Sequence, residues 1–299
     1  MGNGIEARSF KIPTFQLAVP IRHRQESVQE YAAEEVVNAI HFIEEQTGEK
    51  FDWDAFFKSM KRFNAETEEF LEWMEISKTD YPQVMGVTLA LYRYGVYQAA
   101  GGRNQAFLDM DKKLTKMALD AYKSKEMAAK EYRHRAMTWG VQAAYYTALP
   151  IWLLNCWGVV TIADMLSMVS TEMVNTEDKH QAMLDLAYLY ENMIMRNRSN
   201  GGYETGVEAL WRFCEMFNID IVIMYVHMGC KSMSGYHGLF EEEARKHGIH
   251  LIWVTHNLMC PEDGTRRDMR TEINRYMRTV FREEPLDPSL EDFDDSKSW

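Results

Sequence analysis

The chain has 299 residues, of which 46% are hydrophobic, and its 33 basic and 45 acidic residues give a formal net charge of −12. This composition predicts one large or two ordinary globular domains with a sizeable core, and the acidic balance argues against nucleic acid as a principal partner. The sequence contains no apolar run of about 18 residues and no signal-peptide segment at its start, so we expect no membrane span and a cytoplasmic protein.

The first half of the chain is predicted to be helical after a short extended segment. Pro13 and Pro20 favour an extended conformation for residues 8–25. Apolar residues at helical spacing then predict four helices, and the third is apolar nearly all round, as expected of a buried helix. Their expected ranges are 26–46, 52–80, 83–100 and 104–132. The extended segment and these helices are expected to make up residues 1–146.

Residues 147–282 are expected to form an α/β domain, followed by an acidic tail. The apolar run from Ala148 to Cys156 is interpreted as a buried strand. Two amphipathic helices are predicted at 177–196 and 204–217, separated by a turn rich in Gly and Ser. The tail, residues 283–299, contains seven acidic residues and two prolines, and we expect it to lie over the surface or against a partner.

The stretch from Asn218 to Phe281 predicts two parallel strands joined by a crossover helix. The near-continuous apolar run at 219–226 is typical of a strand buried on both faces of a sheet. A helix at 236–247 ends at Gly248, and a second strand at 249–254 precedes a final helix. The fold class predicted is therefore α/β. A helical N-terminal half is followed by a mainly parallel, flavodoxin-like or Rossmann-like three-layer domain.

Right-handed crossovers bring the carboxyl ends of both strands to one edge of the sheet, where ligands of open α/β sheets bind. The side chains expected at this edge are two cysteines and two histidines, His227, Cys230, His256 and Cys260, together with Lys231 and Ser232. Gly229 permits close approach of a ligand to the backbone, and a nearby cation such as Lys231 favours a thiolate at Cys230.

The roles of His227 and Cys260 are alternatives at this point. His227 either orients a ligand or is a hydrogen-bonded histidine at a strand end. Cys260 either joins Cys230 at a metal or packs as a small apolar residue. Cys156 and Cys214 lie in apolar segments and are expected in the core. The wide spacing of the four cysteines excludes a disulfide framework and indicates reduced thiols or metal ligands.

These motifs resemble the C-terminal part of the 2-hydroxyacyl-CoA dehydratase and benzoyl-CoA reductase family. The resemblance rests on His227-x-Gly229-Cys230-Lys231, the following helix and strand, and the helix from Arg266 to Met277. It extends over residues 10–295 and is strongest in 220–281. It implies that Cys230 is one of three cysteines, all from one subunit, that hold a 4Fe-4S cluster.

The resemblance also implies an activity. A partner protein that hydrolyses ATP would pass one low-potential electron to the cluster, which would reduce the thioester carbonyl of an acyl-CoA to a ketyl radical. Dehydration of a 2-hydroxyacyl-CoA or reduction of an aromatic ring would follow. We predict that His227, Lys231 and Ser232 contact the CoA-thioester substrate and that Cys230, with Cys260 as a further candidate, binds the metal.

The chain departs from the family in two places. Members commonly read Asp-Leu-x-Asp-x-Arg where this chain has Asn257–Glu262. The family's first α/β domain, which supplies the other two cluster cysteines, is expected to be absent because no counterpart precedes Phe10. A cluster that takes three or four thiolates is therefore not expected in this chain alone.

Two kinds of function follow, and both include a related partner protein. In the first, the chain is a subunit, or the C-terminal part of one, of a radical CoA-thioester enzyme completed by a homologous full-length or complementary subunit. In the second, it is a shortened, non-catalytic paralogue that acts as an accessory subunit, or a Cys/His metal-binding module. The sequence does not indicate which acyl group the CoA thioester carries.

Overall fold

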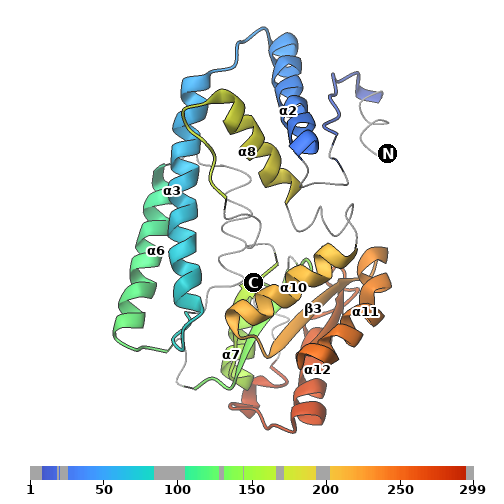
Figure 1. Cartoon of the computed structure of the whole chain (residues 1–299). Helices are drawn as coiled ribbons and strands as arrows, with labels where there is room; N and C mark the ends of the chain where they lie inside the picture. The colour runs from blue at the N-terminus through green and yellow to red at the C-terminus, as the bar shows by residue number, and fades with distance from the viewer. Residues whose placement is uncertain are drawn as a thin grey trace.

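The computed structural model of the protein describes residues 9–18, 20, 26–83, 105–127, 131–143, 145–165, 172–192 and 203–293. In this part of the chain, helices pack on both faces of a parallel four-stranded sheet with the order β2-β1-β3-β4 (Figure 1). The strands are β1 (His134–Trp139), β2 (Val159–Asp164), β3 (Ile221–His227) and β4 (His250–His256). The predicted α/β class with a parallel, three-layer arrangement is confirmed.

Strands β3 and β4 arise from the two apolar runs that the sequence predicts. They pair in parallel from Ile221 opposite His250 to His227 opposite His256. The crossover helix α11 (Lys231–His247) ends at Gly248, which adopts φ +68°. It begins five residues before the predicted start at 236, because Cys230 takes the extended N-cap position directly after the turn that follows β3.

Alternating side chains of β3 enter two separate cores, one on each face of the sheet. Ile221, Ile223 and Tyr225 pack with α7 (Leu149–Trp157) and α12 (Arg266–Tyr276). Val222 and Met224 point to the opposite core, which contains residues of α10 (Tyr203–Phe217) and α11. Burial on both faces explains why β3 is a continuous apolar run rather than an alternating one.

The N-terminal helices pack in pairs beside the sheet (Figure 1). Helix α2 (Glu26–Thr47) packs on α8 (Lys179–Glu191), and α3 (Trp53–Ser77) packs on α6 (Gln105–Lys123). The predicted helix at 26–46 is thus confirmed almost to the residue. The predicted helix at 83–100 and the turn at 199–202 fall, apart from Gln83, outside the described residues.

The prediction of a buried strand from Ala148 to Cys156 is wrong, because this segment forms α7. Pro150 lies in the first turn of the helix, where its missing N–H is tolerated, and Gly158 closes the helix with φ +70°. Nearly every residue of α7 is buried. An apolar run of this length does not distinguish a buried helix from a buried strand.

The prediction of an all-helical region up to residue 146 is also wrong, because β1 lies within it. The sheet therefore starts earlier than residue 147, and β2 is a second strand that the sequence analysis did not predict. The predicted helix at 104–132 ends at Lys123, and Lys125 adopts φ 54° shortly before β1. Charged residues at the start of β1 obscure its short apolar part, which is Ala136 to Trp139.

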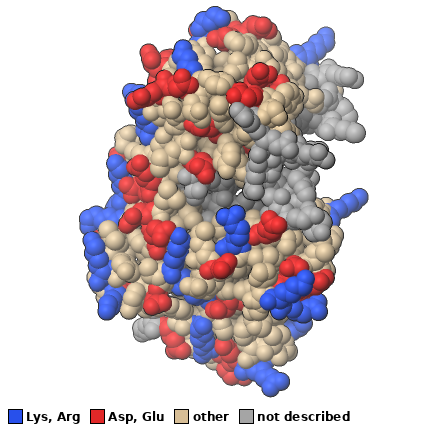
Figure 2. Space-filling model, viewed as in Figure 1, with Lys and Arg blue, Asp and Glu red and all other residues tan. Residues whose placement is uncertain are grey.

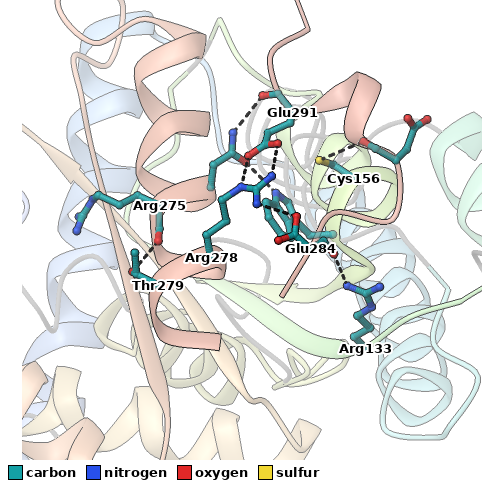
Figure 3. A network of polar contacts seen from close by, with 10 residues as sticks. Arg133, Cys156, Arg275, Arg278, Thr279, Glu284 and Glu291 are labelled. Atoms are coloured by element: carbon teal, nitrogen blue, oxygen red, sulfur yellow. Dashed lines mark hydrogen bonds and ion pairs between the residues drawn. The ribbon is translucent and has the colours of Figure 1, made fainter. Parts of the chain in front are cut away.

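The tail folds back over α7 and α12. The N–H of Leu286 donates to the carbonyl of Cys156 over 2.7 Å, and the indole of Trp152 donates to the carbonyl of Leu290 over 2.8 Å. Figure 3 shows the guanidinium of Arg278 between the carboxylates of Glu284 and Glu291. These bonds fasten the described part of the tail, up to residue 293, to the first and last helices of the α/β region.

The viewed surface carries both signs of charge interspersed over all the helices that it shows (Figure 2). Among the described residues, none of the helices combines the length and the apolar composition that a membrane span requires.

Candidate functional site

The strand order reverses between β1 and β3, since the chain goes from β1 to β2 on one side and then to β3 on the other. Ligands of open parallel sheets bind outside the carboxyl ends of the strands at such a point. Gly140, directly after β1, has φ +101°, and a Cβ there would lie 2.3 Å from the backbone oxygen of Tyr225. The loop after β1 therefore packs against the end of β3 at a distance that only glycine permits.

The turn that carries Cys230 comprises residues 227–230 and is tied to β4. The N–H of Cys230 donates to the carbonyl of His227 over 2.8 Å, and the N–H of Met228 donates to the carbonyl of His256 over 3.0 Å. Nδ1 of His227 lies 3.4 Å from the same carbonyl oxygen. Backbone hydrogen bonds to both strands thus fix the place of this Cys230 turn.

Gly229 makes room for a side chain of its own turn. A Cβ at this position would lie 3.2 Å from Nε2 of His227, so the imidazole fills the space next to the glycine. The sequence analysis assigned that space to a ligand. With its other nitrogen facing the backbone of β4, the His227 ring is held between two strand ends, and its contact with a substrate stays a prediction.

Cys230 is partly exposed at the N-cap of α11, and its Sγ lies 3.3 Å from the hydroxyl of Ser232. The N-terminus of a helix favours negative charge, and so this position favours a thiolate. Lys231 and Ser232 are exposed in the first turn of the helix. Three of the predicted site residues are therefore adjacent on one exposed helix start.

Cys260 does not share this environment. Its Sγ lies 3.0 Å from the carboxylate of Glu262, and this hydrogen bond raises the pKa of the thiol. A raised pKa opposes the thiolate that a metal ligand requires. Cys156 and Cys214 are buried as predicted, and burial raises the pKa of each to about 12.

The predicted convergence of two cysteines and two histidines on one point is not found. Within the described residues, no three His, Cys, Asp or Glu side chains approach one another closely enough to hold a metal ion. The ring of His256 is buried, whereas Cys230 is partly exposed. The right-handed crossover brings these residues to one edge, but their side chains differ in exposure.

A second group of polar side chains is buried near the carboxyl ends of β3 and β4. Tyr225 and His256 belong to neighbouring strands, and their rings meet edge to face with centroids 5.6 Å apart. Both are essentially inaccessible, at 2% and 0% exposure. Among the described residues, the Tyr225 hydroxyl has no hydrogen-bond partner, and the backbone of Asn257 and Val141 lies near the His256 ring without forming a bond of ordinary geometry. Gln142, from the loop after β1, is also buried, and its side-chain nitrogen makes none.

Burial governs the ionisation of this pair. It raises the pKa of Tyr225, and the nearby Tyr146 and Asp164 act in the same direction. It lowers the pKa of His256, although the backbone of Asn257 and Val141 opposes that shift and the adjacent His227 adds to it. Both side chains are therefore held in their uncharged forms.

The sequence analysis placed His256 at this edge but did not single it out, and it overlooked Tyr225 and Gln142. A signal was present in each strand. Tyr225 and His256 are polar side chains near the end of an apolar run, at positions where alternation points them to one face. Gly140 directly after Trp139 was a signal for a close backbone approach.

Fold and site together define a doubly wound α/β protein whose candidate site lies at the switch point between β1 and β3. A sequence model of the family described as "2-hydroxyglutaryl-CoA dehydratase, D-component" matches residues 4–277. The chain belongs to this family, and the resemblance to 2-hydroxyacyl-CoA dehydratases is confirmed. The description names one component of a dehydratase, so the enzyme after which the family is named has more than one subunit. A search among curated proteins found no match.

Proposed function

We propose that the chain is a subunit, or the C-terminal part of a subunit, of a radical CoA-thioester enzyme that removes water from a 2-hydroxyacyl-CoA. The family match over residues 4–277 carries the proposal. Cys230 supports it, because this thiol is partly exposed at a helix start, on the edge of the sheet where ligands bind. The proposal includes the ATP-dependent activator and the 4Fe-4S cluster that the family resemblance implies.

The described residues do not fit a complete cluster. Such clusters are held by three or four thiolates, and the two partly exposed thiols are Cys230 and Cys260. Cys260 is bonded to Glu262 with a raised pKa, and the described residues contain no metal-binding group of three or more side chains. We therefore propose Cys230 as one ligand, and a related subunit as the source of the others.

The incomplete ligand set also favours a second candidate, an accessory subunit without a cluster. In that case the chain would bind a complete homologous subunit through the same edge of the sheet. The two candidates differ in whether the activity of the assembled enzyme depends on Cys230.

The test compares two cysteine variants in the assembled enzyme. The chain is produced with the proteins encoded beside it, purified without oxygen, and supplied with ATP and the activator. The loss of water from 2-hydroxyglutaryl-CoA is then measured. Activity that disappears in Cys230→Ser and persists in the matched loop variant Cys260→Ser is the expected result. Equal activity of wild type and Cys230→Ser would leave only the accessory role, and loss in both variants would make Cys260 a ligand as well.

A further inference from the structure

Tyr225 and His256 fill space in the core, but their polar atoms are poorly bonded there. Polar side chains buried to this degree nearly always form hydrogen bonds, because an unpaired buried donor or acceptor lowers stability. Among the described residues, the Tyr225 hydroxyl has no hydrogen-bond partner, and the backbone of Asn257 and Val141 lies near the His256 ring without forming a bond of ordinary geometry. A phenylalanine at either position would fill a similar volume without this cost.

The position of the pair indicates a ligand. Tyr225 is the last β3 side chain that points into the core with α7 and α12, and His256 is the last residue of β4. Both lie beside the switch point of the sheet. Gln142 adds an unpaired side-chain amide from the loop after β1. Three neighbouring segments thus bring unpaired polar groups to the edge that also carries the Cys230 turn.

We propose that Tyr225 and His256 bind a hydroxyl group of the ligand, namely the 2-hydroxyl of a 2-hydroxyacyl-CoA thioester. The inference deepens the proposed function and rests on it. A hydroxyl is uncharged and both donates and accepts hydrogen bonds. The phenol offers a donor, and a neutral imidazole offers one donor and one acceptor, so the three groups are complementary.

The uncharged state of the pair selects against ionic groups. Burial holds Tyr225 as a phenol and His256 as a neutral imidazole, through the raised pKa of the first and the lowered pKa of the second. A carboxylate or phosphate would have to lose its hydration at the same depth without a countercharge from this pair. The CoA phosphates and the distal carboxylate of 2-hydroxyglutaryl-CoA therefore bind elsewhere, and only the part of the acyl chain around C2 reaches Tyr225 and His256.

Two loops with glycines at close contact enclose the pair. A Cβ at Gly140 would lie 2.3 Å from the backbone oxygen of Tyr225, and one at Gly264, which has φ +120°, would lie 2.9 Å from the Cα of His256. The loops after β1 and β4 consequently lie directly against the two residues. The acyl group enters when these loops separate, and glycine permits the backbone rotations that this requires.

The first test uses the stability of the full chain without ligand. Tyr225→Phe removes an unpaired hydroxyl and is expected to leave the melting temperature unchanged or to raise it. The matched variant Tyr190→Phe removes a hydroxyl that donates to the carbonyl of Ala32 over 3.1 Å, and it is expected to lower the melting temperature by about 2–4 °C. A similar drop in both variants would show that the Tyr225 hydroxyl has a structural bond, and would overturn the inference.

The second test measures binding of 2-hydroxyglutaryl-CoA and of glutaryl-CoA, which lacks the 2-hydroxyl, to the chain purified with its associated subunits. Wild type is expected to bind the hydroxylated thioester about tenfold more tightly, the effect of one buried hydrogen bond. Tyr225→Phe and His256→Phe should bring this ratio close to one, whereas Tyr190→Phe should preserve it. If wild type binds neither thioester, the proposed function fails. If it binds both and the variants keep the wild-type ratio, this inference alone fails.

Discussion

The guanidinium of Arg135, on β1, donates from Nη2 to the carbonyl oxygen of Ser77, the last residue of α3, over 2.7 Å. Its other nitrogens donate to the carbonyls of Thr79 and Phe217, each over 2.9 Å. One side chain thus joins the end of a long N-terminal helix, the end of α10 and the sheet. Helix ends carry unpaired carbonyls, and a cation there is favourable.

Arg135→Ala is expected to lower the free energy of unfolding by about 3 kcal/mol, because three partly buried carbonyls lose a charged donor together. The control is Arg275→Ala, because the Arg275 side chain is 65% exposed and its guanidinium pairs with Glu272 on the same helix. That variant should change stability by less than about 0.5 kcal/mol. Urea unfolding of both variants is the measurement, and equal effects would show that the Arg135 bonds contribute little.

The four thiols should differ in reactivity. Cys230 and Cys260 are partly exposed, while Cys156 and Cys214 are buried with pKa values raised to about 12. A thiol reagent at pH 8 is therefore expected to modify two cysteines per folded chain and four after unfolding. Mass spectrometry of the modified peptides identifies them. Rapid modification of Cys156 in the folded chain would contradict the docking of the tail over α7.

The tail should be held less tightly in acid. The guanidinium of Arg278 keeps the pKa of Glu291 below its ordinary value of 4.5. A carboxylate whose pKa is lowered by folding stabilises the folded state above its unfolded pKa, and this contribution is lost as pH falls through the folded pKa. Arg278→Gln is expected to lower the stability slightly at pH 7, as for other surface ion pairs.

The corresponding measurement is urea unfolding of wild type and Arg278→Gln between pH 7 and pH 3. The difference between them should shrink below pH 4.5, where the unfolded carboxyl binds its proton. A difference that stays constant down to pH 3 would mean that the ion pair with Glu291 is not its origin.

The chain alone is expected to carry no stoichiometric 4Fe-4S cluster, because the described residues offer one suitable thiol and no group of three ligands. Iron and acid-labile sulfide are measured after anaerobic reconstitution. Four irons per chain that are lost in Cys230→Ser and kept in Cys214→Ala would contradict this expectation. They would show that the chain completes a cluster by itself or by pairing with a second copy.

The chain is also expected to associate with a related subunit through the edge that carries His227, Cys230, Lys231 and Ser232. Apolar surface close to this edge includes Met228 and Met259, which are 50% and 73% exposed. Size-exclusion chromatography with light scattering, and pull-down from the native host, measure the association. Lys231→Glu should weaken it, while Lys116→Glu, a charge change on α6, should not. A monodisperse monomer that recovers no related subunit would count against both candidate functions.

The strands that flank the crossover helix were predictable because each signal was local. The apolar run at 219–226 and the stop at Gly248 require no knowledge of distant residues. Helix α7 was not predictable in this way, because the apolar Ile151 occupies its exposed face and removes the periodicity that separates a helix from a strand. The apolar part of β1 is short and follows the charged residues His134 and Arg135, so it gives only a weak strand pattern.

The candidate site was likewise predictable only in part. The edge at which Cys230 lies followed from the handedness of crossovers, which is a general rule. The difference in exposure between Cys230 and His256 depends on how the 227–230 turn bonds to β4, and the burial of Tyr225 depends on a loop that starts at Gly140. Such contacts join residues distant in sequence and are set by packing, which periodicity and spacing do not encode.

The place of β1 inside the sheet has a consequence for synthesis of the protein. β1 is synthesised before β3, but Ala136 pairs with Ile221, so one edge of the strand stays unpaired while the intervening segment is made. The nascent chain consequently exposes an apolar strand edge until β3 has been synthesised, which makes it a substrate for chaperones that bind extended apolar segments.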